Sequence, residues 1–219
     1  MTHQTHAPKR DGSEVSDATK RVPNREYQPR SYRELRAVLG ESDSGLEWME
    51  VGLRHLKAEH ATGGSARMDE LAKLHGVKVN AFDWSYVATQ WARLQIVSVC
   101  QYLEWFLDEF RHELDRPFRQ RLSKEDALHY TLDVLMLSES SVGTLEVAVL
   151  DYCRIIRNRF LHDPDAEEPK RLAARRTSIR DEIPASLYMN LEAPNDAESA
   201  QFNDFVLYSR AVKNFSRRL

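Results

Sequence analysis

The chain has 219 residues, of which 42% are hydrophobic and 30% are charged, and its formal net charge is −3. This length is enough for one domain with a sizeable core, and the charge excludes the global basic field of a strong non-specific nucleic-acid binder. No apolar run approaches the length of a membrane span and the N-terminus has no signal-peptide core, so we expect a cytoplasmic protein that makes no membrane contact.

The first third of the chain is predicted to be a polar segment followed by short helices. Residues 1–30 are polar and lack an apolar period, which predicts disorder. Residues 31–40 begin with the capping-box sequence Ser-Tyr-Arg-Glu and end at a glycine, which predicts a short helix. A second amphipathic helix is expected over residues 46–60, and a flexible link over 62–65 leads to a third helix over 66–75.

The middle of the chain predicts the centre of a helical bundle. Residues 83–114 are apolar over a wide arc, so this helix should be central, and Pro117 should end it. A second capping-box sequence at 123–126 leads a helix whose apolar residues continue to Leu137, and the serines of 138–141 break the chain. Three consecutive long helices with short links predict antiparallel packing.

The C-terminal part predicts two further helices. Residues 170–180 carry five basic residues with acidic neighbours, which indicates a solvated charged helix or, alternatively, a phosphate-facing patch beside His162. Residues 183–191 could be extended or form a short strand. Residues 195–198 should cap a last helix that ends near residue 218.

The helix that ends at His162 carries two different faces. At about 100° per residue, its apolar residues form one core stripe: Val142, Leu145, Val149, Cys153, Ile156 and Phe160. Asp151, Arg154, Asn158 and His162 form a second, polar stripe, and Arg157 lies on the border between the two. The following Asp-Pro-Asp sequence at 163–165 should end the helix. The two stripes predict one face for the core and another for a site or a partner.

The polar residues at the end of this helix suit phosphate chemistry. An arginine is a permanent cation that can hold a phosphate, and a histidine can transfer a proton near neutral pH. The structural alternative is that the helix dipole favours basic residues in a last turn, and that Asp151 and Arg154 form an ordinary surface pair. Spacing alone leaves both interpretations open.

The segment Arg157-Asn158-Arg159-Phe160-Leu161-His162 resembles the signature of the HEPN superfamily, the higher eukaryotes and prokaryotes nucleotide-binding domain. That signature is an arginine, commonly followed by a polar residue, and then a histidine at the end of a long helix. The resemblance covers about residues 80–165. It implies an all-α, HEPN-like antiparallel helical bundle with additional N- and C-terminal helices. We therefore expect a single helical domain over 31–219, with its core bundle at 80–165 and a C-terminal helical extension at 166–219.

The resemblance also implies an activity, namely metal-independent endoribonuclease cleavage that leaves 2′,3′-cyclic phosphate ends and needs no cofactor. RNA cleavage of this kind needs two proton transfers and the motif supplies one histidine per chain, so a homodimer would pair two motif helices into a composite site. By the resemblance, His162 would be the acid–base residue, Arg157 the phosphate clamp, and Asn158 an orienting group. Arg154 and Asp151 would make a secondary phosphate contact or an ion pair. Toxin–antitoxin or antiviral defence systems, with an antitoxin or regulatory partner, are the implied setting.

Two other interpretations stay open. Some HEPN-like bundles are non-catalytic interaction or scaffold modules, and the acidic balance of this chain favours that interpretation. The motif could also be a coincidence in a plain helical dimerisation domain. The remaining histidines do not assemble a metal site, and His112 and His129 lie on charged helix surfaces without an assigned role. Cys100 and Cys153 lie in apolar helical runs, which indicates buried thiols rather than a disulfide.

Overall fold

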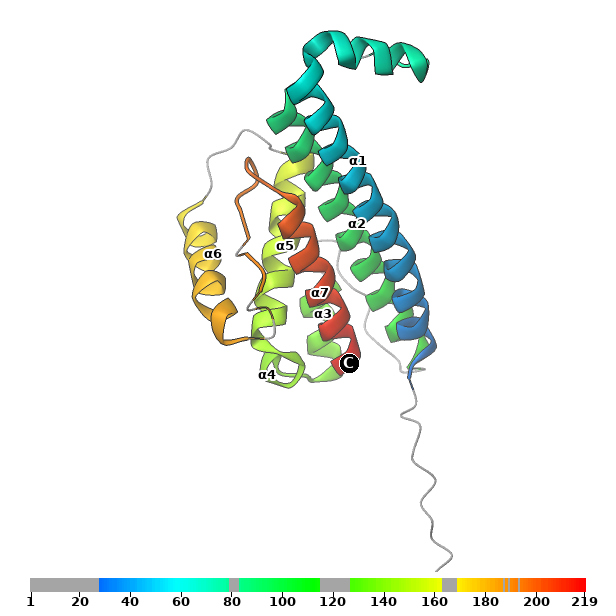
Figure 1. Ribbon diagram of the computed structural model, residues 1–219. Coiled ribbons are helices and arrows are strands. Elements are labelled where there is room, and N and C mark those ends of the chain that lie inside the picture. The colour runs from blue at the N-terminus through cyan, green and yellow to red at the C-terminus, as the bar shows by residue number, and fades with distance from the viewer. Residues whose placement is uncertain are drawn as a thin grey trace, which may run out of the picture.

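The structure is a computed structural model that describes residues 28–78, 83–114, 127–162, 169–186, 188, 190–192 and 194–219. In chain order the elements are α1 (Arg30–Leu74), α2 (Trp84–Glu113), α3 (Ala127–Leu135), α4 (Glu139–Val142), α5 (Thr144–His162), α6 (Lys170–Glu182), the 3-10 helix η1 (Ile183–Ala185) and α7 (Phe202–Arg218). The described residues contain no strand, which confirms the all-α prediction (Figure 1). The predicted disorder over 1–27, the stop at Pro117, the cap at 123–126 and the helix end at 163–165 lie outside the described residues.

The bundle is built around α2, which packs against α1, α3, α5 and α7. In Figure 1, α1 and α5 run in the opposite direction to α2 and α7, so α2 packs antiparallel to both α1 and α5. The hydrophobic core includes α7 and the beginning of α1 as well as residues of the bundle predicted at about 80–165. The amphipathic α7 buries one face against α2 and α5.

The N-terminal third forms one element of 45 residues in which two helical segments meet at Gly64, and the helices predicted over 31–40 and 46–60 are joined into the first of these segments. The glycines at 40, 45 and 52 face open space and do not interrupt it, because an internal glycine costs a helix only about 1 kcal/mol. The helix bends at Gly64, which has the positive φ of 62° that favours glycine. The predicted link at 62–65 is therefore a kink inside a helix.

The predicted capping box at the start of α1 is replaced by a tertiary contact. Pro29 precedes the helix without a side-chain cap. The backbone N–H and hydroxyl of Ser31 both donate to Glu113 Oε2, at 2.9 and 2.8 Å, and the backbone N–H of Arg30 donates to Glu113 Oε1 at 2.6 Å. The carboxylate at the end of α2 thus satisfies the first N–H groups of α1, which is the task of a capping side chain.

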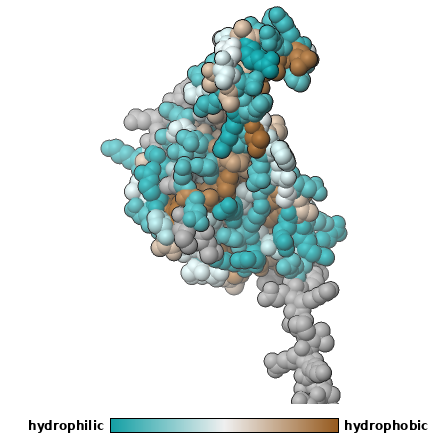
Figure 2. Space-filling model, viewed as in Figure 1, coloured by the Kyte–Doolittle hydropathy of each residue, from teal (hydrophilic) through white to brown (hydrophobic). Residues whose placement is uncertain are grey.

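Beyond Leu39, α1 has no buried residue. Its stretch before Gly64 still contacts the bundle, because Leu46 packs against the core and Asp43 accepts from Ser209 of α7. Only the segment after the kink projects as an arm (Figure 1). Trp48 is 72% exposed and Leu74 is 76% exposed, and Figure 2 shows apolar residues at the end of this arm.

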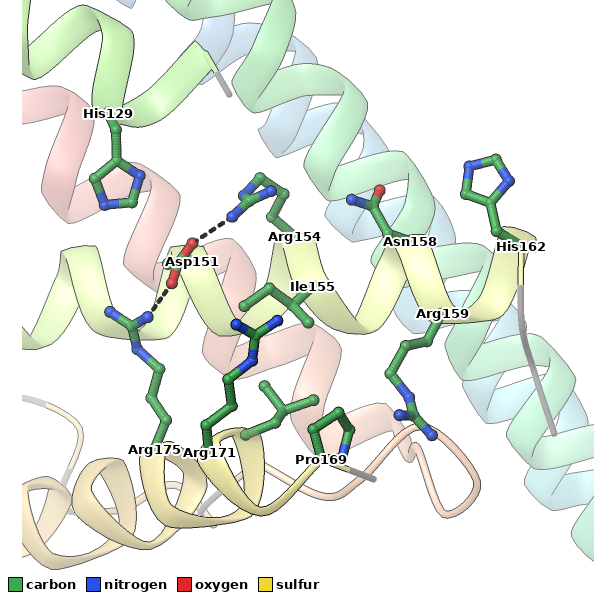
Figure 3. Close-up of a pocket in the computed structure, with 11 residues that line it drawn as sticks. His129, Asp151, Arg154, Ile155, Asn158, Arg159, His162, Pro169, Arg171 and Arg175 are labelled. Atoms are coloured by element: carbon green, nitrogen blue, oxygen red, sulfur yellow. Dashed lines mark hydrogen bonds and ion pairs between the residues drawn. The ribbon is translucent and has the colours of Figure 1, made fainter. Parts of the chain in front are cut away.

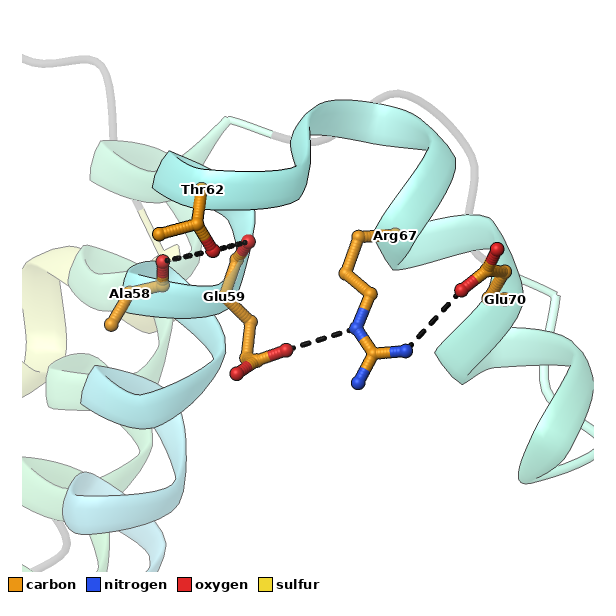
Figure 4. A network of polar contacts seen from close by, with 5 residues as sticks. All are labelled: Ala58, Glu59, Thr62, Arg67 and Glu70. Carbon is orange, nitrogen blue, oxygen red and sulfur yellow. Dashed lines mark hydrogen bonds and ion pairs between the residues drawn. The ribbon is translucent and has the colours of Figure 1, made fainter.

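Arg67 bridges the kink, because its guanidinium binds Glu59 on one side at 2.9 Å and Glu70 on the other at 3.2 Å (Figure 4). This network joins the two helical segments across Gly64.

The second half of the chain follows the predicted order with shifted boundaries. Residues 139–142 form α4 instead of a break, and the chain turns at Gly143, where a side chain would collide with Glu146 and Arg218. α5 extends to His162, the last residue described before residue 169. Residues 183–185 form η1, and Gln201 with Asp204 makes the capping box of α7, so the possible strand and the predicted cap at 195–198 are both wrong. The backbone N–H of Asn195 instead donates to Asp204 Oδ1, at 2.8 Å.

Candidate functional site

A cavity of about 750 Å³ lies between α5 and α6 (Figure 3). Its described lining is dominated by basic side chains, with one carboxylate among them: His129, Asp151, Arg154, Ile155, Asn158, Arg159, His162, Pro169, Arg171, Leu172 and Arg175. The cavity follows the polar face of α5 from its middle to its last turn. The arrangement therefore offers an elongated, positively charged surface suited to an anion.

The polar stripe predicted from helical spacing lines this cavity. Asp151, Arg154, Asn158 and His162 are all part of the lining. Figure 3 shows Asn158 and His162 on the same side of α5 as Arg154. The opposite stripe packs inward, where Val149, Cys153 and Ile156 belong to the hydrophobic core. The two-faced helix predicted from the sequence is confirmed.

α6 is anchored by a few apolar residues and turns arginines towards α5. Leu172 and Ile179 are buried, and Arg171 and Arg175 line the cavity. Figure 3 shows both guanidinium groups rising from α6 towards α5. The sequence left two interpretations of this helix open, a solvated charged helix and a phosphate-facing patch. Arg171 and Arg175 fit the second, because both face the cavity. Of the remaining basic residues of α6, Lys170 and Arg180 are exposed and Arg176 is half-buried.

Asp151 joins the two walls of the cavity. Its side chain is 3% exposed, and its two oxygens accept from different arginines. Oδ1 accepts from Arg154 Nη2 at 2.7 Å, and Oδ2 accepts from Arg175 Nη1 (Figure 3). The predicted pair of Asp151 and Arg154 is thus present, but it is part of a triad between helices around a buried carboxylate rather than an ordinary surface pair. Buried carboxylates are stable only with such partners.

The histidine and the amide of the motif lie at the other end of the cavity. His162 is exposed in the last turn of α5, and Asn158 is half-buried one turn earlier. Leu161, beside His162, is 56% exposed. An exposed imidazole at a helix end is accessible both to a ligand and to a second protein chain. The predicted acid–base role requires access to both.

Arg157 is not among the residues that line the cavity, because its side chain is directed towards α2. Its Nη2 and Nη1 donate to Glu104 Oε1 and Oε2, at 2.7 and 3.2 Å, in a bidentate pair. Burial acts to lower the pKa of Arg157, but the hydrogen bond to Glu104 and nearby negative charge outweigh it, so this pKa lies above its ordinary value. The structure therefore brings together Asn158, His162, Arg154 and Asp151, and leaves Arg157 apart. Its role as a phosphate clamp stays a prediction.

Two lining residues, His129 and Arg159, were given no site role from the sequence. Arg171 and Arg175 belong to the charged helix for which a phosphate-facing patch was one of two interpretations. They are four residues apart, and this spacing places them on one face of a helix. His129 was set aside as a surface residue because no sequence pattern links α3 to α5.

The cysteines and the histidines supply no second reactive centre in the described part of the chain. Cys100 and Cys153 are buried free thiols with their Sγ atoms 3.1 Å apart. Burial raises the pKa of Cys153 well above its ordinary value, which keeps the thiol protonated and unreactive. Within the described ranges, no group of three His, Cys, Asp or Glu side chains could hold a metal ion. A search of these same ranges finds no helix both long and apolar enough to span a membrane.

Comparison of the chain with protein-family models, curated proteins and solved structures finds no match.

Proposed function

We propose that this protein is a metal-independent endoribonuclease of the HEPN type and that the cavity between α5 and α6 is its RNA-binding site. One observation carries the proposal: four arginines, Asn158 and His162 line a single cavity, and one carboxylate is the only acidic group in its described lining. Guanidinium groups bind phosphate through paired N–H donors, and an imidazole transfers protons near neutral pH. The two functions needed for phosphodiester cleavage are thus both present along one cavity.

The proposed reaction is a transesterification. The 2′-oxygen attacks the adjacent phosphorus, the bond from phosphorus to the 5′-oxygen breaks, and a 2′,3′-cyclic phosphate and a 5′-hydroxyl result. One proton leaves the 2′-hydroxyl and another is added to the departing oxygen. His162 performs one transfer, and His162 of a second copy performs the other in a homodimer. Exposed Leu161 offers an apolar contact for that pairing.

In this proposal a phosphate contact is assigned to Arg159. Arg159 lines the cavity, whereas Arg157 donates to Glu104 and does not line it. Asn158, between these arginines in the sequence, can donate to the phosphate or orient the imidazole. Arg157 becomes a second clamp only if its pair with Glu104 opens. The resemblance extends the proposal to a toxin or defence role and to a regulatory protein that covers the cavity.

The test is cleavage of an end-labelled tRNA pool in excess chelator by wild type, His162→Ala and His112→Ala. His112 is a matched control because it is exposed in the last turn of a helix outside the cavity. We expect His162→Ala to lose about 10²- to 10⁴-fold in rate, and His112→Ala to cleave like wild type with cyclic-phosphate ends. Equal cleavage by all three proteins would overturn the proposal.

The bidentate pair of Arg157 with Glu104 favours a second candidate, a non-catalytic interaction module. In that case Arg157 has a structural role in joining α5 to α2 and takes no part in chemistry. Glu104→Gln separates the two candidates. If Arg157 is a restrained clamp, Glu104→Gln increases the cleavage rate. If no variant cleaves RNA and Glu104→Gln only lowers the free energy of unfolding, the interaction module is the better description.

A further inference from the structure

The cavity has a second cluster of basic groups, distant from His162. Arg154, Arg171 and Arg175 surround Asp151 at the other end (Figure 3). Asp151 precedes His162 by eleven residues of one continuous helix. At 1.5 Å per residue, this spacing corresponds to about 16 Å along α5. A single phosphate cannot contact both ends, so the second cluster needs its own explanation.

The charges of this cluster are unbalanced among the described residues. Asp151 uses one oxygen for Arg154 and the other for Arg175. Arg171 has no hydrogen bond to a described residue, and it lies one helical turn from Arg175. Two like charges four residues apart destabilise a helix unless an anion lies between them. Arg171 therefore offers a guanidinium group for an additional anion, beside the pair of Asp151 and Arg175.

We propose that Arg154, Arg171 and Arg175 bind a second phosphate of the same RNA strand, several nucleotides from the bond that His162 cleaves. The identity of this ligand rests on the proposed function, because the cavity continues from this cluster to His162. Asp151 is the positioning residue: it fixes Arg154 and Arg175, and Arg171 is the principal contact. α5 and α6 pack directly against each other, so the contacts to this phosphate come from two neighbouring helices.

The experiment measures binding rather than cleavage. A fluorescently labelled 2′-O-methyl RNA has no 2′-hydroxyl to attack phosphorus, so it remains intact. The dissociation constants of a trinucleotide and a hexanucleotide are measured by anisotropy at several salt concentrations. The proteins are wild type, Arg171→Gln and Arg180→Gln. Arg180 is the matched control because it is an exposed arginine on the same helix that does not line the cavity.

We expect Arg171→Gln to weaken hexanucleotide binding by roughly tenfold and to reduce the slope of log K against log salt by about 0.7. The trinucleotide should bind similarly to all three proteins, because it is too short to reach both ends. Equal constants and slopes for Arg171→Gln and Arg180→Gln would overturn the second site, as would a failure of wild type to bind the hexanucleotide. Binding with the expected loss but without cleavage of natural RNA would overturn the ribonuclease alone. Cleavage by wild type with no effect of Arg171→Gln would overturn the second site alone.

Discussion

The two faces of α5 are held in place by different forces. The inner face packs Val149, Cys153 and Ile156 into the core against α2 and α7, and each of these side chains is at most 1% exposed. The outer face meets α6 through one buried carboxylate and arginines from both helices. Burial of apolar area contributes to stability without directional partners, whereas a buried charge is stable only while its partners remain in place. We therefore expect the inner face to determine stability, and the outer face to determine what binds.

The largest effect on stability should come from substitution of one of two neighbouring isoleucines. Ile156 is 1% exposed in the core, and Ile155 lines the cavity as a half-buried residue. Ile156→Ala should lower the free energy of unfolding by about 2–5 kcal/mol because it leaves a cavity in a packed interior. Ile155→Ala should cost about 1 kcal/mol, since its surroundings are partly open. Urea denaturation measures both. Equal losses would show that the outer face is as tightly packed as the core.

The next effect concerns Asp151, the carboxylate that joins the two helices. Asp151→Ala leaves Arg154 and Arg175 close together without their shared anion. Loss of one member of a buried pair costs about 3–5 kcal/mol, and we expect about 1–3 kcal/mol here, because the arginine side chains are 28% and 36% exposed. Hydrogen exchange should speed up throughout α6. Unchanged exchange in α6 would mean that Leu172 and Ile179 hold this helix without the ion triad.

The sequence predicted the motif helix well because the evidence for it is local. Its two stripes follow from a 3.6-residue period that one segment contains in full. The break predicted between residues 40 and 46 was wrong because internal glycines are equally local signals whose cost is small, whereas the link predicted at 62–65 coincides with the kink at Gly64. The direction of Arg157 was not predictable, since it lies on the border between two stripes. Glu104, its partner, is 53 residues away in the sequence.

The smallest effect on stability should come from Glu113, whose carboxylate binds the start of α1 and is more exposed to water than that of Asp151. Burial acts to raise its pKa, but hydrogen bonds from the backbone of Ser31 and Arg30 outweigh it, so the pKa of Glu113 lies below its ordinary value. A carboxylate whose pKa is lower in the folded state stabilises that state above its unfolded pKa, and this contribution is lost as the pH falls through the folded pKa. Below about pH 4.5, amide exchange over residues 31–35 should therefore accelerate after correction for intrinsic rates. Glu113→Gln should abolish this pH dependence. The same pH dependence in the Glu113→Gln variant would assign the effect to another carboxylate. The contact of Glu113 with α1 would then contribute nothing measurable to stability, in contrast to that of buried Asp151 with its arginines.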